Sequence, residues 1–312
     1  MGWGIVMAAA LVAQAAATDF DALWNYDDPA GTEAKFEAVR PAVLASGDHG
    51  RLLELDTQIA RTQGLQRDFD RAFATLASVH AALRAGEARA EVRYELELGR
   101  ALRSSGHPGE ARPHFERAKT LAAAAHQEAL AIDAVHMIAL VEPDPAQQIA
   151  LNREAIGFAQ VSDDPKARGW QASLWNNIGM TYQGQGQLDP ALAAFRTALA
   201  LREQQGNGHL IRVAKWMIAW ILRLQGDLPD ALAAQEALER EQAEAGDGGG
   251  YVFEELGEIH LALAKRSPPA DHAARAQAYF AKAYLMLKDD PDLADDPARV
   301  ARMKRLGDGG PE

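Results

Sequence analysis

The side chains of this sequence that are best suited to chemistry favour binding over bond making. Asn176 and Asn177 are adjacent, and each carboxamide offers a hydrogen-bond donor together with an acceptor, which is what a peptide group needs. Trp216 and Trp220 are four residues apart, so on a helix they share one face and can stack on an apolar side chain. Arginines that could meet a carboxylate occur at several positions, which are Arg100, Arg103, Arg212 and Arg223.

Patterns that support catalysis, phosphate binding or metal binding are not found. The segment GQGQLD, residues 184–189, has two glycines of a dinucleotide fingerprint, but Asp189 stands at the third glycine position. No GxxxxGK[ST], GxSxG or HExxH is present, and the nine histidines are scattered. The acidic run DDPDLADDPA lacks the glycine of a calcium loop. We therefore expect no catalytic residue, no metal ligand and no cofactor, and predict that the protein is not an enzyme.

The elements that must position these side chains are helices. Alanine dominates the apolar residues, as in ALAAFRTALALRE, and alanine loses no side-chain entropy in a helix. Between Trp175 and Glu203, two helical patterns are separated at Gly184 and Gly186, and Pro190 falls in the first turn of the second pattern. This segment is predicted to be a hairpin of two antiparallel helices.

The same segment resembles the tetratricopeptide repeat (TPR), whose pattern is a tryptophan, a large apolar residue, a small residue, a tyrosine, a turn glycine, an alanine, an aromatic residue and a final alanine. The matching residues are Trp175, Ile178, Gly179, Tyr182, Gly186, Ala191, Phe195 and Ala198. A second copy supplies Leu98, Gly99, Leu102, Gly106, Ala111, Phe115 and Ala118, and a third supplies Ile218, Ala219, Leu222, Gly226, Ala231 and Leu238.

Weaker copies fill the remaining stretches and set the length of the repeat. If the small position is occupied in turn by Ala60, Gly99, His136, Gly179, Ala219 and Gly257, the copies are 39, 37, 43, 40 and 38 residues apart. The standard TPR period is about 34 residues, so the chain is similar to the longer-period, kinesin-light-chain-like kind. His136 is large for this position, and Glu142–Pro145 (EPDP) shortens the turn that follows. We therefore expect a distorted or hinged third repeat.

The resemblance implies an all-α fold, a right-handed superhelical solenoid of about six antiparallel helix hairpins with capping helices at both ends. The corresponding segments are N-terminal capping helices in 18–50, the repeat array in 51–288, and a C-terminal capping helix with a frayed tail in 289–312. Trp24 and Tyr26 are expected to cover the end of the first hairpin. Caps are needed because the end faces of a solenoid otherwise expose its core.

The resemblance also implies where a partner would bind, because the first helix of each TPR hairpin lines a concave groove. In the fourth repeat, the groove positions would be Asn176, Asn177, Met180 and Gln183, where kinesin-light-chain-like repeats use asparagines to hold the backbone of an extended peptide. In the fifth repeat they would include Arg212, Trp216, Trp220 and Arg223, and in the second Arg100 and Arg103. The resemblance therefore implies a non-catalytic scaffold that binds a protein or a peptide.

Each of these residues has a structural alternative. Trp216 and Trp220 can equally pack between neighbouring hairpins, because an aromatic stripe at helical spacing often belongs to the core. Asn176 and Asn177 can simply be solvated on an exposed helix face. Arg100 and Arg103 can pair with nearby carboxylates such as Glu97. The sequence leaves these alternatives open.

Composition limits the class of partner. The chain has a formal net charge of −12, and it has no basic block with interleaved aromatic residues, so we expect no nucleic-acid partner. Hydrophobic residues make up 48% and charged residues 24% of the chain, which is typical of a folded protein with a real core. With no cysteine there can be no disulfide and no thiolate metal site.

The first seventeen residues, MGWGIVMAAALVAQAAA, carry no charged side chain and end in an A-x-A pattern before Thr18. They resemble a secretory signal peptide and are too short to span a membrane, which takes about 20 residues, although the n-region lacks Lys or Arg. Location in the periplasm or secretion follows if this segment is cleaved, and the alternative is an uncleaved helix in the cytoplasm. Two further functions stay open: a sensor that responds to a small ligand or peptide, and a structural subunit of a bacterial envelope assembly.

Overall fold

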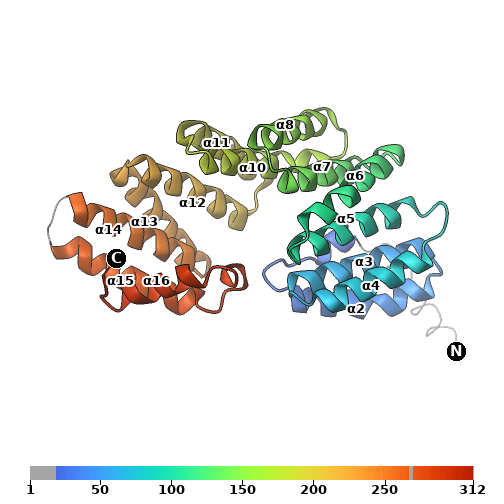
Figure 1. The fold of residues 1–312 in the computed structure, drawn as a ribbon, viewed down its shortest axis with the longest axis horizontal. Helices are drawn as coiled ribbons and strands as arrows, with labels where there is room; N and C mark the ends of the chain where they lie inside the picture. The colour runs from blue at the N-terminus through green and yellow to red at the C-terminus, as the bar shows by residue number, and fades with distance from the viewer. Residues whose placement is uncertain (1–18, 247, 267–269, 312) are drawn as a thin grey trace. The chain divides into compact units, whose positions relative to one another are not determined.

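A computed structural model describes residues 19–246, 248–266 and 270–311. The expected signal peptide, residues 1–17, lies outside the described residues. All the regular structure in the described residues is helical, which confirms the all-α prediction (Figure 1). Among these helices, none is long and apolar enough to cross a membrane.

Six helix hairpins follow one another along the described chain, as the repeats predicted. They are α3 (His49–Leu65) with α4 (Phe69–Ala82), α5 (Ala88–Ser104) with α6 (Pro108–Ala124), α7 (Glu128–Val141) with α8 (Pro145–Val161), α10 (Gln171–Gly184) with α11 (Leu188–Gln205), α12 (Gly208–Gln225) with α13 (Leu228–Ala245), and α14 (Gly250–Arg266) with α15 (Ala270–Leu287). The remaining elements are η1 (Phe20–Leu23), α2 (Pro29–Ala45), α9 (Pro165–Gly169), η2 (Pro291–Leu293) and α16 (Pro297–Gly307).

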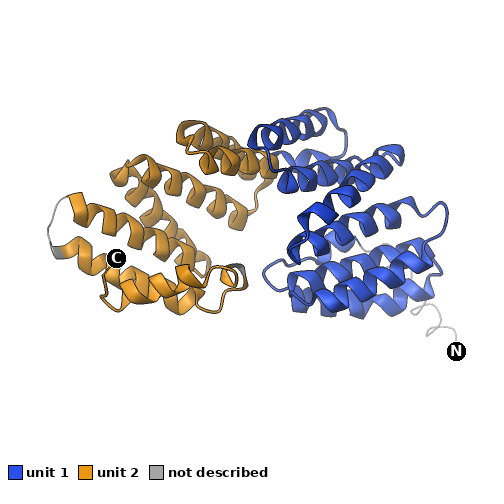
Figure 2. Cartoon of the chain, in the orientation of Figure 1, with its two compact units in different colours: residues 1–171 blue, residues 172–312 orange. Residues whose placement is uncertain are grey.

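The chain forms two compact units, which we call unit 1 (Met1–Gln171) and unit 2 (Ala172–Glu312) (Figure 2). Unit 1 holds the first three hairpins, with α2 packed on α3 as the N-terminal cap. Unit 2 holds the last three hairpins, with α16 packed on α15 as the C-terminal cap. In this cap, Met303 and Leu306 are buried against Phe280 and Ala283 of α15.

An Asp-Pro pair starts four of the helices, and its geometry explains why they begin there. The aspartate side chain accepts a hydrogen bond from a backbone N–H of the first turn, and the proline sits where no N–H is needed. Asp28, Asp144, Asp164 and Asp296 each cap a helix in this way. The acidic segment before α16 is therefore partly explained as a helix cap.

The two helices of a hairpin pack closely where the repeat has its glycine. A Cβ atom added to Gly179 of α10 would lie 2.7 Å from Cε1 of Phe195 on α11, which no real side chain tolerates. Phe195 is itself fully buried. The glycine and the aromatic residue of the repeat are therefore one interlocking pair, and this is why both belong to the pattern.

The third hairpin corrects one detail of the predicted register. Ala134 and Ile138 of α7 pack in one cluster with Phe115, in the way that Tyr94 and Leu98 of α5 pack beside Leu76 and Val79. The equivalent residues are thus 40 positions apart, which places Ala139, 2% exposed, in the small position and makes the choice of His136 wrong. The cause is that α7 has 14 residues and α5 has 17, because the EPDP turn ends α7 early.

Candidate functional site

The predicted groove residues of unit 2 occupy equivalent positions on two successive first helices. Asn176, Met180 and Gln183 of α10 precede Trp216, Trp220 and Arg223 of α12 by 40 residues each. Together with Asn177 and Arg212 they form what we call the unit 2 face. Arg212 lies half-buried one turn before Trp216 on α12.

The carboxamides of Asn176, Asn177 and Gln183 on α10 make no hydrogen bond with another described residue. The Nδ2 atom of Asn177 is buried and has no hydrogen-bond partner among the described residues. The side chains of Asn176 and Gln183 are half-buried and make no hydrogen bond within that same part of the chain. Met180, 39% exposed, lies between them on the same helix. This stretch of α10 thus presents unengaged polar groups around an accessible apolar side chain.

The two tryptophans of α12 are built into the packing between hairpins. Their rings stack on each other, with centroids 5.7 Å apart and an interplanar angle of 21°. Trp216 donates from Nε1 to the backbone oxygen of Tyr251 at 3.1 Å and packs against a cluster that includes Leu256. Trp220 packs beside Phe195 in the preceding cluster. Both tryptophans stay half-buried, so each packs in the core and remains partly accessible to solvent.

Arg223 forms an ion pair within the protein. Its guanidinium makes two hydrogen bonds to the Glu255 carboxylate, at 2.6 and 2.7 Å, and Glu255 is 4% exposed. Burial would lower the pKa of Arg223, but the hydrogen bonds and the charge of Glu255 raise it, so the guanidinium stays charged. The neighbouring Glu254 is held in the same bidentate way by Arg299 of α16, at 2.7 Å for both bonds.

In unit 1, Arg100 also forms ion pairs within the protein, whereas Arg103 does not form one with any described residue. Arg100 of α5 bonds Glu97 at 2.7 Å and also pairs with Asp133 of α7, and its side chain is only 15% exposed. Arg103, one turn further along α5, is exposed and has no ion pair among the described residues. Partial desolvation of its guanidinium and the charge of the neighbouring Arg100 both lower the pKa of Arg103. The alternative that the sequence left open for these arginines therefore holds for Arg100 alone.

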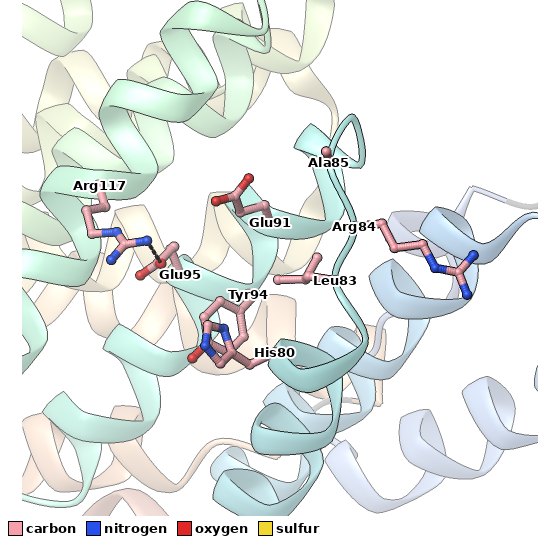
Figure 3. Close-up of a pocket in the computed structure, with 8 residues that line it drawn as sticks. All are labelled: His80, Leu83, Arg84, Ala85, Glu91, Tyr94, Glu95 and Arg117. Carbon is pink, nitrogen blue, oxygen red and sulfur yellow. Dashed lines mark ion pairs between the residues drawn. The ribbon is translucent and has the colours of Figure 1, made fainter.

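A pocket lies elsewhere in unit 1, between α4, α5 and α6 (Figure 3). It has a volume of about 300 Å³, and Tyr94 and His80 stack at one side of it with ring centroids 5.0 Å apart. Glu95 is held there by Arg117 at 3.0 Å and by His114 at 2.6 Å. The Glu95 carboxylate is thus already bound by two side chains of the protein, which is typical of an ion pair that stabilises the fold. In the described part of the chain, no three His, Asp or Glu side chains come together as a metal site would require.

The sequence did not single out the acidic side chains that pair with Arg223 and Arg299. Glu254 and Glu255, with Glu258, lie on α14 around the small residue Gly257, where the sixth repeat should contribute to the same surface. The repeat register therefore indicated these positions. It did not distinguish these glutamates from the many others of an acidic chain, because their partners lie 32 to 45 residues away.

Comparison with known proteins agrees with this architecture. The tetratricopeptide repeat family matches residues 170–240, which cover the fourth hairpin and most of the fifth. No curated protein sequence matches the chain. The family match confirms the tetratricopeptide repeat that the sequence resembled.

Several solved structures are similar in fold. The apo form of RapI is 12% identical, with a TM-score of 0.66 over 96% of this chain and 80% of that one. BtubC (BKLC) from P. vanneervenii is 18% identical, with a TM-score of 0.55 over 73% of this chain and 93% of that one. A signal transduction ATPase with a tetratricopeptide repeat sensor, PH0952 from Pyrococcus horikoshii, is 10% identical, with a TM-score of 0.59 over 91% of this chain and 45% of that one. At these identities the similarity shows the fold alone.

Proposed function

We propose, from the premise that residues 170–240 are tetratricopeptide repeats within an all-helical solenoid, that the protein is a non-catalytic scaffold that binds a peptide segment of another protein. A solenoid of this kind offers an extended surface suited to protein partners. The finer part of the proposal is the place of binding, which is the unit 2 face.

The observation that carries this place is the buried Nδ2 of Asn177, which has no hydrogen-bond partner among the described residues. Leaving a buried donor unsatisfied costs about 1–3 kcal/mol. When the Asn177 side chain turns to expose this atom, a carbonyl oxygen of an extended peptide would accept the hydrogen bond, while the Asn177 oxygen and the carboxamide of Asn176 could meet neighbouring peptide groups. The cost would then be recovered when the partner binds.

The other residues of the face would divide the remaining tasks. Met180 and the accessible part of Trp220 would contact an apolar side chain of the peptide. Gln183 would add a further hydrogen bond. Arg223 is already paired with Glu255, so the two together would present a neutral rim and would not recognise a partner's carboxylate.

Site-specific photo-crosslinking tests the place of binding. A photoreactive amino acid at position 180 should capture a partner protein from the cells that make this chain, whereas the same group at the exposed Gln204 of α11 should not. Adding Asn176→Ala with Asn177→Ala should abolish the product at position 180. Folded variants with unchanged products would remove the unit 2 face from the proposal.

Two further proposals concern the sensor alternative and the location. If the protein instead senses a small ligand, a metabolite screen should raise the Tm in the absence of any protein partner. For location, we propose the periplasm or secretion if residues 1–17 are removed, with a role in an envelope assembly as the corresponding alternative. N-terminal sequencing of the mature chain separates these outcomes, because a chain that begins at Thr18 supports export and one that retains Met1 supports the cytoplasm.

A further inference from the structure

Residues 19–26, which we call the N-terminal strap, lie against several helices of unit 1 that are distant in sequence. Trp24 donates from Nε1 to Oε1 of Gln58 on α3 at 3.1 Å. Tyr26 stacks on Trp24 with ring centroids 4.8 Å apart, and the Arg61 guanidinium lies over both rings, 5.2 and 5.3 Å from their centroids. The aromatic part of the strap is therefore held by a carboxamide and a cation of α3.

The carboxylates of the strap reach two further helices. Asp21 pairs with Arg93 of α5 at 3.0 Å and with Lys166 of α9 at 2.7 Å. Asp19 pairs with the same lysine at 2.8 Å. Lys166 follows these aspartates by 147 and 145 residues, so the strap connects the N-terminus of the described chain with α9, the last helix of unit 1.

The side chains around the strap carry an excess of positive charge, although the whole chain has a net charge of −12. Charged side chains near the strap are linked to one another by ion pairs or lie beside one another, and we call this group the unit 1 face. Its cations are Arg51, Arg61, Arg89, Arg93, Arg100, Arg103 and Lys166, and its anions are Glu54, Glu97 and Asp133. The two carboxylates of the strap thus offset part of this positive charge, which is a local charge complementarity.

Most of the contacts of the strap are accessible to solvent. The side chains of Asp19, Asp21 and Lys166 are 51%, 39% and 50% exposed, and ion pairs of this kind are individually weak. Tyr26 is 57% exposed. Only Phe20 is fully buried, where it packs edge-to-face on Phe36 of α2. Trp24 is half-buried and packs on Phe36 with ring centroids 5.4 Å apart. The contacts of Asp19, Asp21 and Tyr26 could therefore be exchanged for those of another segment while α2 and α3 remain folded.

We propose that the unit 1 face is a second binding site, for an acidic peptide segment that carries an aromatic residue, and that the strap occupies this site until such a segment displaces it. The occupant has the chemistry of the strap itself, namely carboxylates for Arg93 and Lys166 and an aromatic ring for Arg61. The unpaired Arg103 offers a further carboxylate contact that the strap does not use. This site goes beyond the proposed function, because it lies in the other unit and selects charge.

The test uses a fluorescent peptide that copies residues 18–28 and a control peptide in which its aspartates are asparagine. Fluorescence anisotropy measures the Kd of each peptide for the full chain and for the variant Asp19→Asn plus Asp21→Asn. Removing the carboxylates of the strap should tighten binding of the acidic peptide by about 3- to 10-fold, because the competitor is weakened. Equal Kd values for the two proteins, or for the two peptides, would overturn the proposal.

Matched lysines identify the face that binds. In the double variant, Lys166→Ala should weaken binding of the acidic peptide by about 3- to 10-fold. Lys119→Ala removes a similarly exposed lysine, which pairs with Glu154 at 3.0 Å on α6 and α8, and should leave the Kd unchanged. An equal effect of both lysines would show general charge attraction and would overturn the assignment of the site.

Hydrogen exchange of the unmodified chain gives a readout that needs no variant. The acidic peptide should accelerate exchange at residues 19–26, and the control peptide should not. Unchanged exchange at saturating acidic peptide would show that the strap is not displaced. Crosslinking at position 180 should be the same in the Asp19→Asn plus Asp21→Asn variant, so failure at the unit 1 face is distinguishable from failure at the unit 2 face.

Discussion

Phe195 fills the space that a side chain at position 179 would need, since a Cβ atom on Gly179 would stand 2.7 Å from the ring. The second hairpin repeats the arrangement with Gly99 and Phe115, and the sixth with Gly257 and Phe280. The close approach of the two helices in these hairpins depends on the missing side chain, and the α10 surface that carries Asn177 is positioned by this contact.

Replacing Gly179 with alanine should therefore destabilise the protein. Overpacking against Phe195 costs about 1–3 kcal/mol, which exceeds the roughly 1 kcal/mol or less that alanine gains in helix propensity. Urea denaturation should show a lower midpoint for Gly179→Ala. The control is Gly157→Ala in the middle of α8, where the glycine is exposed and a Cβ would meet nothing within 4 Å, so this variant should be more stable. Shifts of the same sign in both variants would contradict the close-packing argument.

Arg223→Ala should lower the free energy of unfolding by about 2–4 kcal/mol, because it leaves the buried Glu255 carboxylate without its bidentate partner. Lys215→Ala on the same helix removes an ion pair with Glu241 whose side chains are 37% and 40% exposed, and should cost less than about 1 kcal/mol. Combining Arg223→Met with Glu255→Leu should recover most of the loss. If the double variant were no more stable than Arg223→Ala, the buried charge would not be the cause.

The stability of the protein should fall between pH 6.5 and about pH 4 through His136. Burial, with smaller effects of nearby arginines, lowers the pKa of His136 from 6.5 to about 4. In this pH window the unfolded chain therefore binds a proton that the folded chain does not, and each unit of pH removes up to about 1.4 kcal/mol. His136→Phe retains a ring against Trp170 and removes the titrating group, so its stability should fall less steeply when thermal unfolding is followed across this range. Parallel curves for the two proteins would exclude His136 as the source.

Asn177→Leu should separate stability from binding. Leucine has a similar size and carries no unsatisfied donor, so the variant should be as stable as the unmodified protein or more stable by about 1 kcal/mol. Capture of a partner by the crosslinker at position 180 should nevertheless be lost. A stable variant with undiminished capture would show that the Asn177 carboxamide does not contact the partner.

Much of the fold could be predicted because the repeat is a local pattern. The glycines at positions 99, 179 and 257 and their aromatic partners lie within single hairpins, so a short stretch of sequence contains both sides of each contact. The register of the third hairpin was the exception. His136 was assigned to the small position from a weak match to the repeat pattern, and only the packing of Ala134 and Ile138 beside Phe115 showed that the EPDP turn shortens the end of α7.

The sequence could predict which positions share the candidate site. It could not predict which of their side chains are already hydrogen-bonded within the protein. The 40-residue register correctly groups Asn176 with Trp216 and Met180 with Trp220 as equivalent positions. It could not show that Arg223 is paired with Glu255, that Trp216 bonds the backbone of Tyr251, or that the Asn177 amide is left without a partner. Each of those facts depends on which side chain of the next hairpin comes within hydrogen-bond distance.

The sequence by itself determined the helices, their pairing into hairpins and the tetratricopeptide repeat of residues 170–240, because helix propensity, turn residues and small-to-aromatic packing act over fewer than about 40 residues. Only the tertiary structure decided which charges are neutralised and which surfaces stay open. Asp21 meets Lys166 across 145 residues of chain, and no local pattern contains that contact. It arises because the stacked hairpins bring α3, α5 and α9 close enough for one short acidic segment to reach all three.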